Sequence, residues 1–94
     1  MRITILPGDG IGPEVTAEAL RVIRSISDVG KIDLEYTFEE IGGSAIRNSG
    51  VPLPSETLDS CLRSDAVLLG SVGDPEFDSL PPSERPEAGL LSLR

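Results

Sequence analysis

The sequence contains no histidine, no tryptophan and only one cysteine among its 94 residues. Without histidine, the chain cannot form a Ser-His or Cys-His nucleophile pair, and it cannot bind a metal through imidazole. Cys61 cannot form an internal disulfide, which favours a reducing, cytoplasmic location. Because Cys61 lies at helical spacing among apolar residues, we expect it to be a small core side chain rather than a reactive thiol.

Basic residues and long apolar runs are also scarce. Eight Lys and Arg residues are outnumbered by sixteen Asp and Glu residues, and the net charge is −8. A nucleic-acid partner is therefore not expected, because phosphate binding needs clustered basic side chains. No apolar run approaches the roughly 18 residues of a transmembrane helix. No secretory signal follows Met1, so we expect no membrane partner.

The length of the chain and its pattern of apolar residues predict one small α/β domain with three main strands alternating with helices. Residues 2–6 form a β-rich run that stops at Pro7 and Gly8. A helix is expected from Pro13, which suits a first helical position, to Gly30, which suits a helix end. Its buried face is expected to contain the apolar residues that recur at steps of three and four, namely Val15, Ala19, Val22, Ile23 and Ile26.

Two further helices and a strand are expected in the middle of the chain. Residues 32–39 alternate between apolar and polar side chains, which predicts a strand with one buried face. A short helix is expected at residues 44–47, ending near Gly50. Another helix begins at Ser55, and its apolar side is expected to contain Leu58, Cys61 and Leu62.

The last third of the chain predicts a strand, a loop and the start of a helix. Residues 66–70 lack polar alternation, which predicts a central strand buried on both faces. Residues 71–87 are rich in proline and acidic side chains, so we expect a long surface loop. A helix is expected to begin at Ala88. Since only seven residues of it are present, we expect the chain to be truncated.

The segment LPGDGIGPE at residues 6–14 is a glycine-rich turn between the first strand and the first helix. Free N–H groups at such a turn could face an anion or the edge of a cofactor. Alternatively, the glycines serve only the tight turn. The segment is not the G-x-G-x-x-G Rossmann fingerprint, because its third glycine falls one residue early.

This segment resembles the N-terminal signature of the β-decarboxylating dehydrogenases, the isocitrate and isopropylmalate dehydrogenase family. The resemblance continues through residues 38–45, which include the expected pair of glycines, and through residues 66–73. Residues 85–94, RPEAGLLSLR, are most similar to the isopropylmalate branch. The resemblance implies a two-domain, non-Rossmann α/β fold, of which residues 1–94 would be the N-terminal portion.

The resemblance also implies an activity. It is the NAD-dependent oxidative decarboxylation of 3-isopropylmalate to 4-methyl-2-oxopentanoate in leucine biosynthesis, by a cytoplasmic homodimer that uses Mg²⁺ or Mn²⁺. The family's metal ligands and its catalytic acid and base lie beyond residue 94. We therefore assign no catalytic or metal-binding residue, Tyr36 included, and we expect the chain alone to be inactive.

The resemblance further implies binding residues. Arg94 matches an arginine that holds the substrate carboxylates, Leu90 and Leu91 match the pocket for the isopropyl group, and Glu87 matches a residue between substrate and nicotinamide ribose. Ile11 matches an apolar contact to adenine. The cofactor loop that the resemblance implies comprises Asp74, Pro75, Glu76, Phe77, Asp78, Ser79, Leu80, Pro81, Pro82, Ser83, Glu84, Arg85, Pro86 and Glu87.

Other interpretations of these features stay open. A sister enzyme could act on isocitrate, homoisocitrate or tartrate, but Leu90 and Leu91 would leave a polar substrate tail unpaired. The chain could instead be a non-catalytic, acidic α/β binding module. The cluster of Asp74, Glu76 and Asp78 is expected to be a solvated face rather than a metal site. Two positions depart from the family pattern, since Asp74 stands where glycine is frequent and Ala88 where a hydroxyl residue is frequent.

Overall fold

A three-stranded parallel sheet forms the centre of the computed structural model, which describes residues 1–77 and 79–93. Strands β1 (Arg2–Gly8), β2 (Glu35–Phe38) and β3 (Ala66–Ser71) lie in the order β2-β1-β3. In this register Ile5 lies opposite Phe38 on one side and Leu68 on the other. The predicted α/β fold with three strands alternating with helices is confirmed.

The central strand is β1, and not the segment at 66–70 that the sequence pattern favoured. Ile5 and Leu6 of β1 are fully buried, whereas Ala66 and Val67 of β3 are exposed. The prediction was wrong because β3 has a neighbour on one side only, among the residues that the structure describes. An uninterrupted apolar run is typical of strands in parallel sheets in general and does not fix the position of a strand within the sheet.

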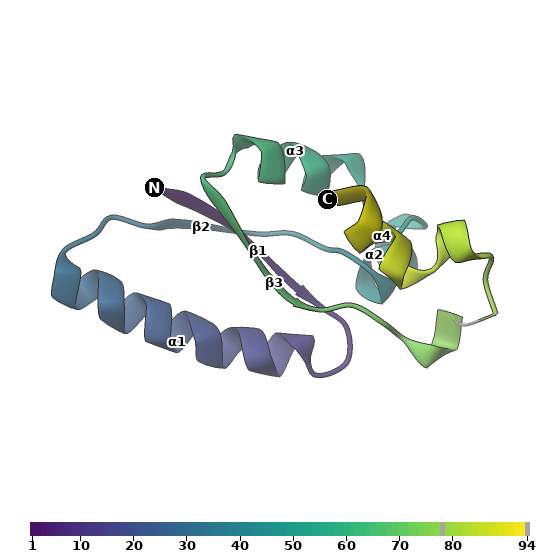
Figure 1. The fold of residues 1–94 in the computed structure, drawn as a ribbon, viewed down its shortest axis with the longest axis horizontal. Coiled ribbons are helices and arrows are strands. Elements are labelled where there is room, and N and C mark those ends of the chain that lie inside the picture. The colour runs from purple at the N-terminus through teal and green to yellow at the C-terminus, as the bar shows by residue number, and fades with distance from the viewer. Residues whose placement is uncertain (78, 94) are drawn as a thin grey trace.

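The helices lie on both faces of the sheet and at one of its ends (Figure 1). Helix α1 (Gly12–Gly30) covers one face, and α3 (Ser55–Arg63) covers the other. Helices α2 (Gly43–Ser49) and α4 (Pro86–Leu93) lie near the ends of the strands. No helix within the described residues has the length and the apolar character needed to cross a membrane.

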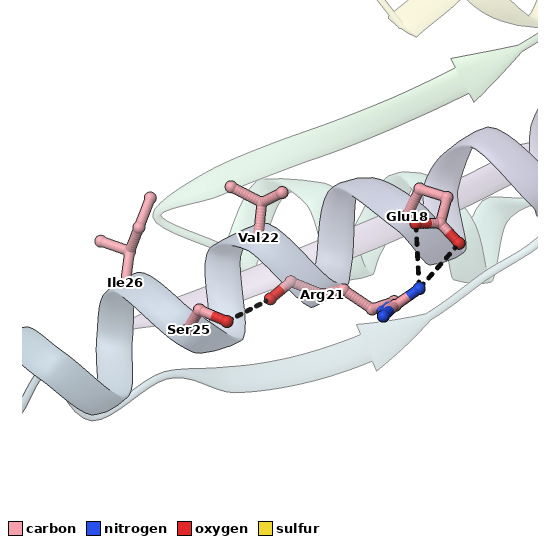
Figure 2. Close-up of a pocket in the computed structure, with 5 residues that line it drawn as sticks. All are labelled: Glu18, Arg21, Val22, Ser25 and Ile26. Atoms are coloured by element: carbon pink, nitrogen blue, oxygen red, sulfur yellow. Dashed lines mark hydrogen bonds and ion pairs between the residues drawn. The ribbon is translucent and has the colours of Figure 1, made fainter.

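Helix α1 packs on the sheet through a different face from the predicted one. Thr16, Leu20 and Ser27 are buried, while Val22 and Ile26 are each 60% exposed. The physical reason is a close crossing, since a Cβ added at Gly12 would lie 2.0 Å from the carbonyl oxygen of Pro7. Small side chains fit where the start of the helix approaches this closely, and Leu20 packs on Ile3 and Ile5 further along. Val22 and Ile26 turn outward, beside the hollow in Figure 2.

Helix α3 also turns a polar face to the sheet. Thr57 and Ser60 are buried, whereas Leu62 of the predicted apolar side is 75% exposed. The buried groups have partners, because Thr57 Oγ1 donates to the carbonyl of Glu40 at 2.6 Å and Thr4 of β1 donates to the carbonyl of Ser60 at 3.1 Å. Hydrogen bonds therefore replace apolar contacts at this crossing.

The boundaries of α2, β2 and α4 lie within a few residues of the predicted ones. Helix α2 ends at Ser49, and Gly50 follows it as a cap with a left-handed backbone, in agreement with the predicted end near Gly50. Strand β2 is shorter than residues 32–39, and Ile32 and Phe38 are more than half exposed because β2 is an edge strand in the described part of the chain. The expected loop contains two 3-10 turns, η1 (Pro75–Phe77) and η2 (Pro82–Glu84), and α4 begins two residues before Ala88.

Candidate functional site

The segments that follow the three strands meet at one edge of the sheet, because parallel strands have their carboxyl ends together. Open α/β sheets bind ligands at this edge. Residues 9–12 follow β1, residues 39–44 follow β2, and the segment from residue 72 into α4 follows β3. The candidate site therefore combines all three segments.

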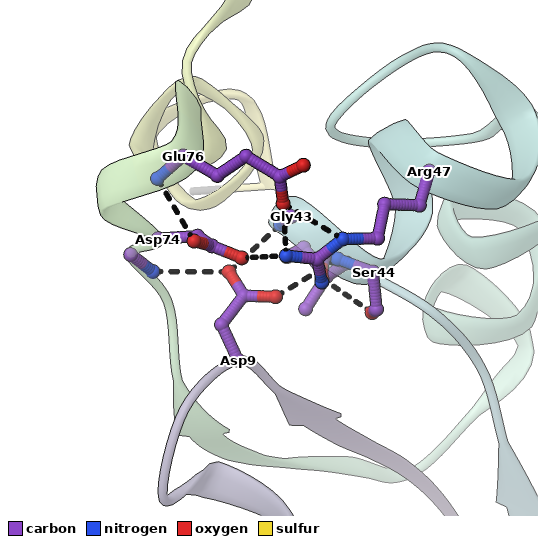
Figure 3. A network of polar contacts seen from close by, with 8 residues as sticks. Asp9, Gly43, Ser44, Arg47, Asp74 and Glu76 are labelled. Carbon is purple, nitrogen blue, oxygen red and sulfur yellow. Dashed lines mark hydrogen bonds and ion pairs between the residues drawn. The ribbon is translucent and has the colours of Figure 1, made fainter. Parts of the chain in front are cut away.

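The carboxylate of Asp9 joins these segments (Figure 3). Asp9 is 4% exposed, and its oxygens accept hydrogen bonds from the backbone N–H groups of Gly43 at 2.7 Å, Ser44 at 2.9 Å and Gly73 at 3.0 Å. The first two donors belong to the first turn of α2, whose N–H groups have no partner within the helix. One buried carboxylate thus fixes α2 and the exit of β3 to the end of β1.

Gly42 and Gly43 allow this contact. Gly42 has a φ of +71°, which favours glycine, and a Cβ at this position would lie 2.5 Å from Oδ2 of Asp9. A Cβ at Gly43 would lie 3.0 Å from Asp9 Oδ1 and from the Cβ of Asp74. The two glycines are therefore needed for the backbone to approach Asp9.

Two N–H groups of the glycine-rich turn already donate hydrogen bonds to carbonyl groups of this chain. The N–H of Asp9 donates to the carbonyl of Ser71 at 2.7 Å, and that of Gly12 donates to the carbonyl of Asp9 at 2.8 Å. These contacts support the interpretation that the glycines serve a tight turn and a close crossing. Ile11 ends the turn with a side chain that is 66% exposed, so an apolar surface is accessible at this edge.

Arg47 of α2 binds the start of the expected cofactor loop. Its Nε lies 3.1 Å and its Nη2 lies 2.5 Å from Glu76 Oε2, and Nη2 also bonds to Asp74 Oδ2. Hydrogen bonds to Glu76 and then to Asp74 raise the pKa of Arg47 above its ordinary value. The guanidinium carbon lies 5.3 Å from the centre of the Phe77 ring.

This ion-pair cluster corrects the prediction of a solvated acidic face. Asp74 and Glu76 are paired with Arg47, and Asp78, the third residue of that face, lies outside the described residues. Over residues 1–77 and 79–93, no group of three or more Asp, Glu, Cys or His side chains is placed to hold a metal ion.

The predicted substrate residues lie on α4, with the exception of Arg94, which is outside the described residues. Leu91 is 67% exposed and Leu90 is half-buried. Glu87 is exposed, and its Oε1 lies 3.5 Å from the point where a Cβ of Gly73 would stand. The structure therefore places Glu87 beside the exit of β3, at the edge where Asp9 and Ile11 lie.

The rest of the expected cofactor loop lies on the surface between β3 and α4. Ser79 and Pro81 to Glu84 are exposed, and Leu80 is half-buried. Arg85 folds back on the loop, because its Nε donates to the carbonyl of Leu80 at 2.8 Å. Pro86 is buried at the start of α4.

Two residues of this edge, Asp9 and Arg47, were missed by sequence reasoning, and Cys61 of α3 is less buried than predicted. Asp9 lies inside the glycine-rich segment, where a lone carboxylate between glycines was an available signal for a capping role. Arg47 gave no signal, because its partners lie 27 and 29 residues away in the sequence. Cys61, expected in the core, is half-buried, and burial followed by the charge of Glu39 raises its pKa.

Known proteins resemble the whole of this chain. The family model for isocitrate/isopropylmalate dehydrogenase matches residues 2–94. The chain belongs to the isocitrate/isopropylmalate dehydrogenase family. It is 55% identical to a 3-isopropylmalate dehydrogenase of Trichormus variabilis, over 99% of this chain and 26% of that protein. It is 54% identical to the enzyme of the same name from Thermotoga maritima, over 100% of this chain and 27% of that protein.

Solved structures of isocitrate/isopropylmalate dehydrogenase relatives have the same fold. The β-decarboxylating dehydrogenase of Thermococcus kodakarensis superimposes with a TM-score of 0.77 at 36% identity, over 99% of this chain and 25% of that one. An isocitrate dehydrogenase of Methylococcus capsulatus gives 0.69 at 32% identity, over 79% of this chain and 21% of that one. The chain spans about a quarter of the length of the curated relatives that it matches.

The chemistry of the edge fits a dinucleotide cofactor of this dehydrogenase family. Ile11 offers an exposed apolar surface for a flat base, and the exposed carboxylate of Glu87 can accept hydrogen bonds from ribose hydroxyls. Asp74 and Glu76, which would repel a pyrophosphate, share one positive charge from Arg47, which offsets half of their combined negative charge. A divalent ion has no corresponding set of ligands among the described residues.

Proposed function

We propose that this chain supplies cofactor- and substrate-binding surface to an enzyme that oxidatively decarboxylates 3-isopropylmalate to 4-methyl-2-oxopentanoate in leucine biosynthesis. The observation that carries the proposal is the 55% identity to a 3-isopropylmalate dehydrogenase, which extends over 99% of the chain. That match includes the three segments at the carboxyl edge of the sheet. An edge of this kind is where open α/β sheets bind small molecules.

On this proposal, the substrate lies against α4. Leu90 and Leu91 receive the isopropyl group, and Arg94, three residues after Leu91 in the sequence, holds a carboxylate through its planar guanidinium. Glu87 lies between the substrate and the cofactor. An apolar surface made by two leucines disfavours isocitrate, because the extra carboxylate would lose its water without gaining a partner.

NAD is the proposed cofactor, and as NAD⁺ it accepts a hydride from the carbon that bears the substrate hydroxyl. Ile11 packs against the adenine, and residues 74–87 contribute backbone groups and hydroxyls to the ribose and phosphates. Asp9 keeps these two segments together through its hydrogen bond to Gly73. Mg²⁺ or Mn²⁺ supplies a Lewis acid to the reaction, and its ligands are expected beyond residue 94.

The setting of the reaction is proposed from the same relatives. We expect a cytoplasmic homodimer whose ligands are small molecules, with no nucleic-acid or membrane partner. The net charge of −8 is consistent with this, because it disfavours binding to phosphate backbones and to anionic lipid surfaces.

The test is a comparison of substrates with the intact protein that carries this chain. NADH formation should be fastest with 3-isopropylmalate, measured as kcat/KM in the presence of Mg²⁺ or Mn²⁺. Isocitrate, homoisocitrate and tartrate should be poorer by at least about a hundredfold, because a specific site rejects an unpaired polar group strongly. A preference for any of these three would replace the proposal with the sister activity, and binding of none of the four would favour the non-catalytic module.

A further inference from the structure

Arg47 has no role in the function proposed above, yet its side chain contacts three residues at the start of the cofactor loop. We propose that Arg47 is a positioning residue for NAD, which fastens the first turn of loop 74–87 to α2 and offsets part of the negative charge of two loop carboxylates. The proposal rests on the proposed function, because it takes residues 74–87 to be the NAD-binding loop.

The contacts of Arg47 are concentrated on one short turn. Nε and Nη2 both bond to Glu76 Oε2, Nη2 bonds to Asp74, and the guanidinium lies over the ring of Phe77 (Figure 3 shows the polar contacts). The turn itself, η1, contains no buried residue. Since packing does little to hold this turn, the guanidinium is its main attachment to the rest of the fold.

Helix α2 is a firm support for this attachment. The N–H groups of Gly43 and Ser44 in its first turn bond to the buried carboxylate of Asp9, and its Ala45 is fully buried. The same carboxylate accepts the N–H of Gly73, directly before the loop. The start of the loop is thus held at two places. The backbone of Gly73 bonds to Asp9, and residues 74–77 contact Arg47.

Charge gives Arg47 its second effect. The side chain of Asp74 is 17% exposed and that of Glu76 is 61% exposed, so neither charge is fully screened by water. Without Arg47, two negative charges would stand beside a cofactor that carries a negative pyrophosphate, and like charges at such short range repel. The guanidinium of Arg47 is charged at any pH at which the enzyme works, because arginine is not deprotonated in proteins.

The test replaces Arg47→Gln in the intact protein and measures NAD binding by calorimetry. We expect the Kd for NAD to rise about three- to tenfold, in line with the loss of a partly exposed, charge-assisted network. The value of kcat and the KM for 3-isopropylmalate, both at saturating NAD, should change less than twofold. Arg21→Gln is the matched control, because Arg21 forms an ion pair with Glu18 on the outer face of α1, away from the edge (Figure 2).

A second readout needs no cofactor. A glutamate-specific protease should cut the Glu84–Arg85 bond faster in Arg47→Gln than in the wild type or in Arg21→Gln, because the loop has lost its attachment. In the triple variant Arg47→Gln, Asp74→Asn, Glu76→Gln, the Kd should return to within about threefold of wild type, since the repulsion is gone. Its cleavage should stay fast, since the attachment is still missing.

The outcomes separate this proposal from the one it rests on. If the wild type binds no NAD, the proposed function fails and this inference fails with it. If the wild type binds NAD but Arg47→Gln changes neither the Kd nor the cleavage rate, only the role of Arg47 is overturned. Should Arg47→Gln not fold, Arg47→Lys is judged by the same two measurements, because lysine keeps the charge and loses the planar fork.

Discussion

Asp9 is the residue with the largest share in holding the candidate site together. Three backbone N–H groups from two segments bond to its carboxylate, which is nearly inaccessible to water. Charge-assisted hydrogen bonds of this kind are about twice as strong as neutral ones, and a buried donor that loses its acceptor is costly. The contribution of Asp9 should therefore be visible in stability as well as in binding.

Replacing Asp9→Asn keeps the shape of the side chain but turns one acceptor oxygen into an NH₂ group. At least one of the three N–H groups then lacks an acceptor, and we expect the free energy of unfolding to fall by about 1.5–3 kcal/mol. Chemical denaturation of the intact protein measures this. Asp59→Asn, on an exposed position of α3, should have no measurable effect; equal losses in the two variants would contradict the role of Asp9.

Gly42 offers a second test at the residue scale, with Gly50 as a comparison. Both have a positive φ, but Gly50 is left-handed with a ψ of −3°, whereas Gly42 has a ψ of −140°. A Cβ at Gly42 would also meet Asp9 at 2.5 Å, whereas a Cβ at Gly50 meets nothing within 4 Å. Gly50→Ala should cost about 1–2 kcal/mol for the left-handed backbone, and Gly42→Ala about 1–3 kcal/mol more for its less accessible backbone and the displaced carboxylate. Thermal denaturation measures both variants, and equal shifts in Tm would contradict a special requirement for glycine at position 42.

The sequence indicated some residues of the candidate site but not the contacts that hold the site together. The resemblance of residues 6–14 and 85–94 to one family singled out two segments far apart in the sequence, and the structure places Ile11 and Glu87 at the same edge of the sheet. The partners of Arg47 could not be predicted, because an ion pair between residues 47 and 76 exists only once the chain has folded. Local patterns contain no information about such pairs.

At the scale of elements, the succession of strands and helices along the chain was predictable. The position of β3 in the sheet and the buried faces of the helices were not. Periodicity finds apolar stripes, but small or hydroxyl side chains of α1 and α3 contribute much of the face that each helix turns to the sheet. At α1, the close crossing at Gly12 is lined by Thr16, and Leu20 is the large apolar side chain that packs in the core. At α3, Thr57 and Ser60 find hydrogen-bonding partners in the segment after β2, which the sequence pattern does not encode.

Helix α4 provides the prediction that bears on specificity. Because Leu91 is 67% exposed, Leu91→Ala should leave stability nearly unchanged. If Leu91 contacts the isopropyl group, kcat/KM for 3-isopropylmalate should fall about 5- to 100-fold, which corresponds to roughly 1–3 kcal/mol. Malates with smaller side chains should lose less, because they do not reach this position.

The control for α4 is Leu62→Ala on α3, since Leu62 is 75% exposed and lies on another helix. Its kcat/KM values should equal those of the wild type. Equal losses on every malate in Leu91→Ala would instead mean that Leu91 supports the helix and does not select the substrate.

At the scale of the whole molecule, the sheet and α1 present much apolar surface. Val22, Ile26 and Val29 on α1 are 60%, 60% and 87% exposed, and Phe38 of β2 is 55% exposed. Parallel sheets are stable when both faces and both edges are covered. Backbone ordering costs on the order of 1–2 kcal/mol per residue, and a partly covered sheet offsets little of it.

The 94-residue chain expressed on its own should therefore show no cooperative thermal transition and no dehydrogenase activity. Circular dichroism at increasing temperature and an assay with 3-isopropylmalate and NAD check the two parts separately. A single sharp transition at a moderate temperature would show that the surface described here is sufficient for a stable fold.

The hydrogen bonds of Asp9 have one more consequence, which concerns how such a site diverges. All three donors are backbone groups, so the attachment places no chemical demand on the side chain of residue 44, a demand for space at residue 43 and a demand for a positive φ at residue 73. Substitutions can accumulate in the segments around the edge while their attachment to β1 is inherited unchanged through a single position. A lineage can thus alter what its loops recognise without having to evolve a new way of holding them.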